Sequence, residues 1–460
     1  MADGSNIVKV RDDCEPIYFS KCDDPENDKV FRVASGQSPD WASAGDFGIA
    51  DLRSRVEPWL TSLFQSEHLS LLVGSGLTTA IQYDACGGGS NGMGDFKPKS
   101  RYAKQIISKT AESAKAAGRG EKPNIEDYIR VMNELLRGLH VLGDEEAYEE
   151  LKSELDGALK DFTDNISDIE RQIATAVEDK RTTAFNKLVL FLMSFASRTG
   201  TRDRLGIFTT NYDRLIEAGA DIAGIRLIDR FVGYLTPVFR SSRLDIDMHY
   251  NPPGIRGEPR YLEGVVHYAK IHGSIDWINA NGSIRRIGLP FGAKDIQPYL
   301  DAPGLNADPS KIMIYPNASK DRETAEYPYV ELFRDFAAAL CRPNSTLVTY
   351  GYSFGDDHIN RIIRDMLTIS STHLVVIAFE DSLGRIMRSY QEWGRPTQIS
   401  LLIGRDIANI DSLVDHYLPK PAIDRTTIRM AELLRQRYEQ NHAVSGTEGG
   451  GTSGDDHASC

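Results

Sequence analysis

The sequence has few cysteines, and their spacing suggests neither a zinc site nor a disulfide framework. Five cysteines are spread over 460 residues with no C-x-x-C pair: Cys14, Cys22, Cys86, Cys341 and Cys460. Zinc ribbons need closely paired cysteines, and disulfide scaffolds need a dense set of them. We therefore predict no metal site and expect a reducing compartment, the cytoplasm.

The sequence also lacks long hydrophobic runs and any excess of positive charge. The most apolar run, Leu188–Met193, is far shorter than the ~20 residues that span a bilayer. Lys and Arg number 53 against 66 Asp and Glu, a net charge of −13, which argues against a surface that broadly neutralises phosphates. We therefore expect neither a membrane nor a nucleic acid as a partner.

The remaining composition is that of an ordinary globular protein, with 41% hydrophobic and 26% charged residues. Four parts differ in character. Residues 1–50 are polar and predict an irregular N-terminal arm, and residues 100–199 show the three- and four-residue apolar spacing of a helical insertion. Residues 51–99 and 200–438 are assigned to one nucleotide-binding domain that ends in a helix near 423–438, and residues 439–460 to a disordered tail.

Short runs of β-forming residues alternate with helical patterns in the domain that surrounds the insertion. This alternation predicts a Rossmann-like α/β fold, a mostly parallel sheet with helices on both faces. Residues 231–263 break the rhythm and predict long loops near the mouth of the sheet. The expected strands are Leu69–Val73, Leu205–Thr209, Val265–Ile271, Ile312–Tyr315, Thr346–Tyr350, Leu374–Phe379 and Ile399–Leu402.

Two of these strands end in residues that could bind a nucleotide. Gly74-Ser75-Gly76-Leu77-Thr78 follows the first strand; its glycines allow close approach of a pyrophosphate, and its amides start a helix. The alternative is a tight turn with a threonine helix cap. Thr210-Asn211-Tyr212-Asp213 places polar side chains where α/β sheets bind ligands, although Thr210 and Asp213 also have the spacing of a capping box.

Two further strand ends add a histidine and a second glycine-rich turn. His272 closes an apolar strand and is followed by Gly273, so it could move protons beside a substrate, or be a purely structural histidine. In the segment from Gly351 to Asp356, backbone amides and the Ser353 hydroxyl could bind phosphate or ribose oxygens. The alternative is a helix capped by Asp356 or Asp357.

Taken together and in this order, the four motifs resemble those of the sirtuin-like family. The segment Gly351-Tyr352-Ser353-Phe354-Gly355-Asp356 resembles in particular the bacterial sirtuin-like NAD hydrolases of antiphage defence. The resemblance covers residues 69–80 and about 205–380, on either side of the helical insertion. It implies that NAD is the substrate and that the bond between nicotinamide and ribose is cleaved.

The resemblance also implies roles for individual residues. Asn211 would position the nicotinamide riboside and the attacking water, His272 would be the general base, and Asp213 would meet the carboxamide. Glu380 and Asp381 are further candidates for an adenosine hydroxyl. The residues expected to bind the remainder of NAD are Gly74, Ser75, Gly76 and Thr78 in the first turn, and Gly351 and Ser353 on the adenosine side.

The sequence departs from the protein-deacetylase branch of that family in two respects. It has no four-cysteine zinc module and no Gly-x-Pro-Asp-Phe-Arg segment, in whose place stands Asp84-Ala85-Cys86-Gly87-Gly88-Gly89-Ser90. We therefore expect an NAD glycohydrolase; the alternatives are an NAD-dependent deacylase and a non-catalytic scaffold that senses NAD or ADP-ribose. The resemblance further implies a regulated homo-oligomer, with a HerA-type ATPase or a phage protein as its activating partner.

Overall fold

The computed structural model describes residues 6–26, 29–42, 45–88, 96–116, 123–197, 203–242, 246–250, 260–280, 282–301, 305, 312–314, 327–381 and 383–420. Residues Met1–Pro419 form one compact unit, and Lys420–Cys460 form another. Of the second unit only Lys420 is described, so the helix expected near 423–438 and the tail expected at 439–460 lie outside the described residues.

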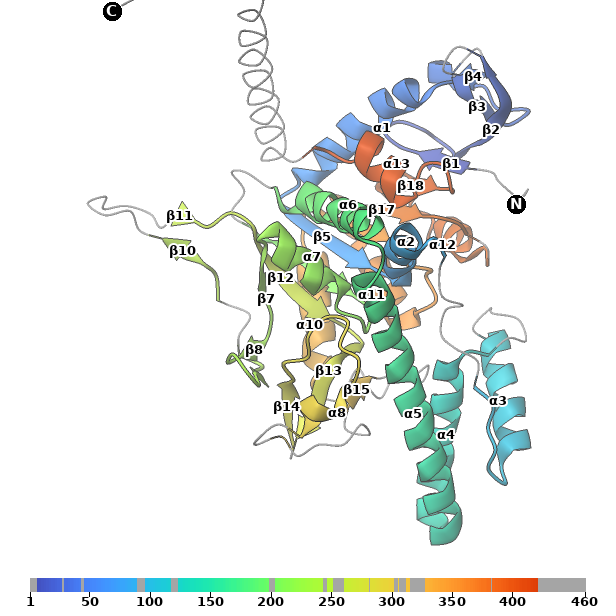
Figure 1. Cartoon of the computed structure of the whole chain (residues 1–460). Coiled ribbons are helices and arrows are strands. Elements are labelled where there is room, and N and C mark those ends of the chain that lie inside the picture. The colour runs from blue at the N-terminus through green and yellow to red at the C-terminus, as the bar shows by residue number, and fades with distance from the viewer. Residues whose placement is uncertain are drawn as a thin grey trace, which may run out of the picture. The chain divides into compact units, whose positions relative to one another are not determined.

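An eleven-stranded sheet forms the centre of the first unit (Figure 1), in the order β4-β3-β2-β1-β18-β17-β16-β5-β6-β12-β7. The last seven strands of this order pair in parallel. This confirms the predicted Rossmann-like α/β fold, and six of the seven predicted strands belong to this sheet, within one residue at each end. The parallel strands are β18 (Ile399–Ile403), β17 (His373–Ala378), β16 (Ser345–Tyr350), β5 (His68–Val73), β6 (Leu205–Thr209), β12 (Val265–Lys270) and β7 (Arg226–Ile228).

Helices cover both faces of the parallel strands, because alternate residues of each buried strand point to opposite sides. Leu71 and Val73 of β5 pack in one apolar cluster, and Leu72 packs in the other. The first cluster contains α1 (Ile49–Phe64), α2 (Ser75–Cys86), α6 (Glu178–Ala196), α7 (Leu215–Ala223), α13 (Ile410–Ser412) and the π-helix Leu413–Tyr417. The second contains α10 (Tyr329–Leu340), α11 (Asp357–Met366) and α12 (Arg385–Trp393).

The expectation of an irregular N-terminal arm is wrong. Strands β1 (Asn6–Lys9), β2 (Ile17–Glu26), β3 (Lys29–Val33) and β4 (Asp46–Phe47) extend the sheet in antiparallel pairing beyond β18; a 3-10 turn, Asp40–Ala42, precedes β4. Three buried aromatic rings hold these strands together, with centroids 5.1–5.5 Å apart: Phe19, Phe31 and Phe47. The division of the chain into domains otherwise stays a prediction.

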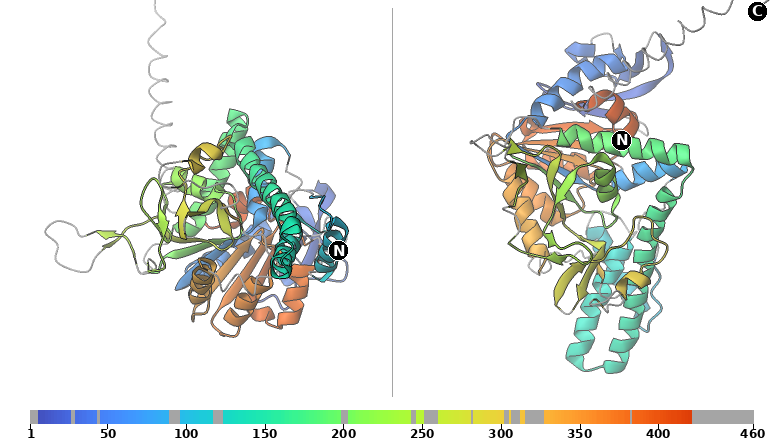
Figure 2. Two further views of the ribbon diagram at one scale, coloured as in Figure 1. Left: turned by 90° about the horizontal axis from the view of Figure 1, so that it is seen from below. Right: turned by 60° about the vertical axis from the view of Figure 1, so that its left-hand side comes forward.

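The predicted helical insertion contains α3 (Ala103–Ala116), α4 (Ile125–Leu142) and α5 (Glu145–Ala174), and it ends in α6. Helices α4 and α5 lie side by side as an antiparallel hairpin (Figures 1 and 2). Their apolar faces share a third buried cluster with a second sheet, to which β13 contributes Ile275 and Ile278. The insertion is therefore packed against the region that follows β12.

The second sheet has the order β15-β13-β14-β9-β8 and is antiparallel. It takes up the predicted strand near Ile312, which was wrongly expected in the main sheet. Four two-residue strands interrupt the loops expected at 231–263. The bounds are β8 (Phe231–Val232), β9 (Val238–Phe239), β10 (His249–Tyr250), β11 (Arg260–Tyr261), β13 (Gly273–Ala280), β14 (Ser283–Arg286) and β15 (Ile312–Ile314); a short helix α8 (Gln297–Leu300) and the 3-10 turn Pro396–Gln398 complete the described elements.

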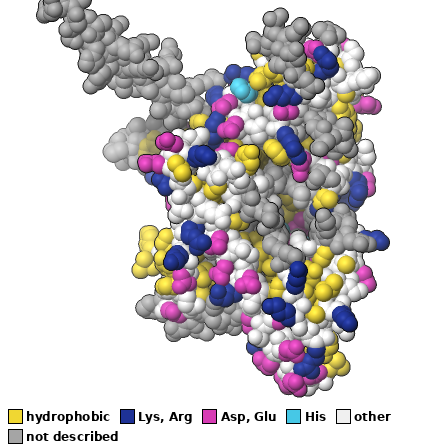
Figure 3. All heavy atoms as spheres, turned by 45° about the vertical axis from the view of Figure 1, so that its right-hand side comes forward, with side chains coloured by type: hydrophobic (Ala, Val, Ile, Leu, Met, Phe, Trp, Pro, Cys, Tyr) yellow, Lys and Arg dark blue, Asp and Glu magenta, His cyan; other side chains and the backbone are white. Residues whose placement is uncertain are grey.

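The distribution of charged side chains on the surface agrees with the expectation that the protein has no broad basic face. On the face drawn in Figure 3, basic and acidic side chains of the described residues are interspersed rather than gathered by sign. Within the described part of the chain, no helix combines the length and apolar character that a bilayer span requires.

Candidate functional site

The site lies where the strand order of the main sheet reverses. From β5 the chain adds β6 on one side, and it later returns to add β16 on the other side of β5. Open α/β sheets bind ligands outside the carboxyl ends of the strands at such a reversal. Three of the four predicted motifs follow β5, β6 and β16, and the fourth follows β12, the neighbour of β6.

One cavity of about 310 Å³ brings all four motifs together at this edge, a volume at the lower end of the ~300–1,000 Å³ range of small-molecule pockets. Helices α4 and α5 supply the rest of its wall along with the start of α12. Gly76 is not among the residues that line the cavity. The other eight predicted site residues line it: Gly74, Ser75, Thr78, Asn211, Asp213, His272, Gly351 and Ser353.

The glycines of the first turn bring two strand ends into direct contact. A Cβ atom on Gly74 would collide with the Gly351 carbonyl oxygen, and one on Gly76 would lie 2.5 Å from the Gly351 Cα. Gly351 has φ +63°, a left-handed conformation that favours glycine. The Gly76 amide donates to the Gly351 carbonyl at 3.1 Å. These glycines are therefore needed for the packing of the two turns, whatever else they bind.

Asn211 and His272 reach the cavity because their strands are in register. Thr209 of β6 pairs with Lys270 of β12, and each site residue lies two positions beyond its strand's paired residue. The Asn211 side chain is buried, and its Nδ2 donates to the Gly74 carbonyl at 3.0 Å. Because a carbonyl can only accept, the amide nitrogen must face Gly74, which turns the amide oxygen of Asn211 toward the cavity.

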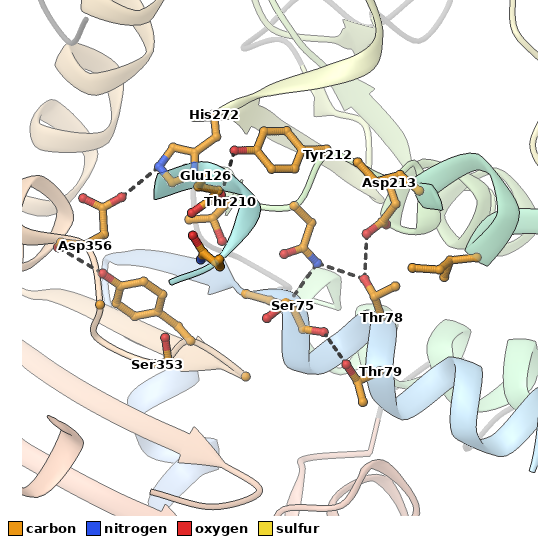
Figure 4. Close-up of a pocket in the computed structure, with 18 of the residues that line it drawn as sticks. Ser75, Thr78, Thr79, Glu126, Thr210, Tyr212, Asp213, His272, Ser353 and Asp356 are labelled. Carbon is orange, nitrogen blue, oxygen red and sulfur yellow. Dashed lines mark hydrogen bonds and ion pairs between the residues drawn. The ribbon is translucent and has the colours of Figure 1, made fainter. Parts of the chain in front are cut away.

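Thr78 connects Asn211 to Asp213. The Thr78 hydroxyl accepts from Asn211 Nδ2 at 3.0 Å and donates to Asp213 Oδ2 at 2.7 Å, as Figure 4 shows for the Thr78 and Asp213 side chains. The other oxygen of Asp213 accepts from the Leu215 amide at 3.0 Å, at the start of α7. Asp213 is thus a helix-starting carboxylate that also fixes the orientation of Thr78.

His272 faces a carboxylate from another turn (Figure 4). Its Nε2 lies 2.9 Å from Asp356 Oδ2, and both side chains are largely buried, 12% and 5% exposed. The N–H direction is not aligned with the oxygen, so the contact becomes an ion pair when the imidazole is protonated. The other oxygen of Asp356 caps α11 by accepting from the His358 amide at 3.1 Å. The predicted helix cap is confirmed, and the same side chain also orients a histidine.

The helical insertion forms the wall beside Asn211 and His272. The Tyr212 hydroxyl donates to Glu126 Oε1 at 3.2 Å, and its ring packs edge-on against Phe162 of α5. Burial raises the pKa of Tyr212 well above its usual value, and the Glu126 carboxylate adds to the rise. Tyr212 therefore stays protonated and ties α4 to the turn that follows β6. Arg214 forms a buried ion pair with Glu170 that ties α5 to the same turn.

Three charged residues of the cavity wall were not among the predicted site residues: Glu126, Arg385 and Asp356, the last expected only as a helix cap. Glu380 and Asp381, in contrast, are not among the residues that line it. Glu380 pairs with Arg405, and the Asp381 carboxylate accepts from the first amides of α12. Among the described residues, no group of three or more His, Cys, Asp or Glu side chains could hold a metal ion.

The fold and the site define a Rossmann-like α/β domain with a ligand cavity at its strand reversal. Residues 205–394 match the family model described as the SIR2-like domain. This match supports a sirtuin-like family, whose members are typically NAD-dependent enzymes, and it includes the motifs at Asn211, His272 and Gly351. No match was found among curated proteins.

Proposed function

We propose that the protein is an NAD glycohydrolase, which releases nicotinamide and ADP-ribose from NAD. The observation that carries this proposal is that Asn211 and His272, from neighbouring parallel strands, line one cavity together with the glycine turn at the strand reversal. Sirtuin-like chemistry takes place at the ribose carbon that bears nicotinamide, and an amide and an imidazole in one cavity suffice for such a step.

The chemistry needs positioning more than strong acid catalysis. Nicotinamide in NAD is a cationic pyridinium, so it leaves as a neutral molecule with the electrons of the broken C–N bond. A water oxygen then bonds to the ribose carbon, which is oxocarbenium-like in the transition state, and gives up a proton. His272 takes this proton, and the Asp356 carboxylate 2.9 Å from its Nε2 stabilises the imidazolium that results. In this proposal the Asn211 amide oxygen holds that water.

Hydrolysis is favoured over deacylation by what surrounds the cavity. A deacylase must admit an acylated lysine of a second protein beside the nicotinamide ribose. Here α4 and α5 contribute Glu126 and Phe162 to the wall next to Tyr212, and the segments of the deacetylase branch are missing from the sequence. A dinucleotide with a single water as co-substrate fits such a wall better than a peptide does.

Incubation of the full chain with NAD alone, and with NAD plus an acetyl-lysine peptide, tests this proposal. We expect nicotinamide and ADP-ribose to appear in equal amounts without the peptide, at a rate that the peptide does not change. Nicotinamide release that depends on the peptide would show a deacylase instead. Tight NAD binding with no loss of NAD would show a sensing scaffold.

The physiological role follows from the same proposal. An unregulated enzyme of this kind would deplete the NAD of its own cell, so we expect activity to be switched on, in line with the resemblance to antiphage-defence proteins. The expected arrangement is a cytoplasmic homo-oligomer activated by a HerA-type ATPase or a phage protein. Native mass measurement with and without such a partner tests this arrangement, and a monomer at every concentration would contradict it.

A further inference from the structure

Arg385 brings a positive charge to a cavity whose other charged groups are mostly carboxylates. It is the first residue of α12, its side chain is 8% exposed, and it lines the same cavity as Asn211. Among the described residues that line the cavity, it is the only lysine or arginine, whereas Glu126, Asp213 and Asp356 supply carboxylates. A buried guanidinium in a ligand cavity is suited to an anionic group of the ligand.

The guanidinium lies near the Ser353 hydroxyl, and glycine at position 355 lets it pack closely against the turn. A Cβ atom on Gly355 would lie 2.5 Å from Arg385 Nη1 and 3.5 Å from the Ser353 hydroxyl oxygen. The guanidinium therefore occupies the space where a side chain at position 355 would begin, and it lies close to the Ser353 hydroxyl. A forked cation next to a hydroxyl is the donor set that binds phosphate oxygens.

Three of the backbone amides expected to hold phosphate are already used within the fold. The Gly74 amide donates to the Tyr350 carbonyl at 2.9 Å, and the Gly76 amide donates to the Gly351 carbonyl at 3.1 Å. The Gly351 amide donates to the Ile377 carbonyl at 3.1 Å. These three amides join the two turns to each other and to the sheet, so an anionic ligand must draw its donors from other groups of the cavity wall, among them the Arg385 guanidinium.

We propose that Arg385, together with Ser353, binds the pyrophosphate of the dinucleotide and makes the site selective for phosphate-bearing nucleotides over nucleosides. This inference rests on the proposed function, because it takes a dinucleotide as the ligand. It adds a specificity-determining residue supplied by α12, at a position where the sequence showed no motif.

Binding of ADP-ribose and of adenosine to the full chain, measured by titration calorimetry, tests the proposal. In Arg385→Gln, we expect the affinity for ADP-ribose to fall about 10- to 100-fold, the range for loss of a charge-assisted hydrogen bond, while the affinity for adenosine stays unchanged. Arg385→Lys keeps the positive charge but loses the planar, forked arrangement of donors. Its affinity for ADP-ribose should lie between those of the wild type and Arg385→Gln. Arg388→Gln removes the same charge from an exposed position of α12 and should match the wild type.

Each outcome has a defined meaning. Equal affinities of Arg385→Gln and wild type for ADP-ribose overturn the inference, and so does an equal loss for ADP-ribose and adenosine, which shows a purely structural role. If the wild type hydrolyses NAD while either of these results holds, the proposed function stands without the inference. If the wild type neither consumes NAD nor binds ADP-ribose, the proposed function fails and the inference fails with it.

Discussion

Replacing Thr78 by valine removes the hydroxyl that joins Asn211 to Asp213 while keeping the size and shape of the side chain. The wild-type hydroxyl accepts from Asn211 at 3.0 Å and donates to Asp213 at 2.7 Å, all three side chains being buried. In the variant, Asn211 keeps only the Gly74 carbonyl as an acceptor. Asp213 keeps only the Leu215 amide as a donor.

The size of the effect follows from these two bonds. A hydrogen bond to a charged group contributes about 1.5–3 kcal/mol and a neutral one about 1 kcal/mol, so unfolding should become easier by about 3 kcal/mol. The loss is within the 5–15 kcal/mol of a typical protein, so the variant should still fold. In the proposed reaction Asn211 positions the attacking water, so the loss of one of its two anchors should lower kcat about 10- to 100-fold.

Steady-state nicotinamide release and denaturant unfolding of Thr78→Val measure both effects. We expect kcat to fall with little change in KM, because the Thr78 hydroxyl, although expected from the sequence to bind NAD, is engaged by Asn211 and Asp213. Thr183→Val is the matched control, since that exposed threonine bonds only to the carbonyl of its own helix, at 2.9 Å. A Thr78→Val protein with wild-type kcat would refute the argument that this hydroxyl orients Asn211.

Three further predictions follow from other parts of the structure. His272→Ala should lose turnover by about 10²- to 10⁴-fold, as expected for a general base, while the protein still folds; wild-type NAD consumption would exclude that role. Glu170→Gln leaves the Arg214 charge buried without its partner and should cost about 3–5 kcal/mol in denaturant unfolding. Glu150→Gln, at an exposed pair of the same helix, should change stability little, and similar losses in both variants would contradict this reasoning. Burial lowers the pKa of His373 from 6.5 to about 4, so the unfolded state takes up a proton that the folded state does not. Stability should therefore fall by about 3 kcal/mol as the pH drops from about 6.5 to about 4, and His373→Gln should show a flatter dependence; an equal slope would contradict it.

The strands of the main sheet could be predicted because each is a short apolar run that stops at a glycine or a polar residue. Leu205–Thr209 and Val265–Lys270 are buried on both sides, as parallel strands are. Their continuous apolar composition predicts this burial. The same pattern does not say which sheet a strand joins. Residues Ile312–Ile314 have the composition of a core strand, yet they pair with β13 in the second sheet.

The N-terminal strands could not be predicted because their stability comes from distant partners. Strand β1 pairs with β18, whose residues lie almost four hundred positions later in the chain, and Phe19, Phe31 and Phe47 meet only in the folded state. The local composition there is polar and rich in turn-forming residues, which favours the prediction of an irregular segment without strands. Strand pairing of this kind is decided by tertiary packing rather than by propensity.

Some residues of the candidate site could likewise be predicted from the sequence, and others could not. The motifs at Asn211 and His272 could be found because polar residues directly follow apolar strands, and the structure places both on one cavity wall. Glu126 could not be found, since it contacts Tyr212 across 86 positions. Gly76 was expected to face a pyrophosphate, but the structure uses its missing side chain to bring two turns together. A sequence shows that glycine is needed, not which neighbour needs the space.

Nicotinamide release from NAD by the wild type and by Asn211→Ala, measured beside NAD binding to the same samples, tests the central claim most directly. We predict that the wild type converts NAD to nicotinamide and ADP-ribose, whereas Asn211→Ala still binds NAD and leaves it intact. Turnover by Asn211→Ala at the wild-type rate would contradict a reaction carried out in this cavity.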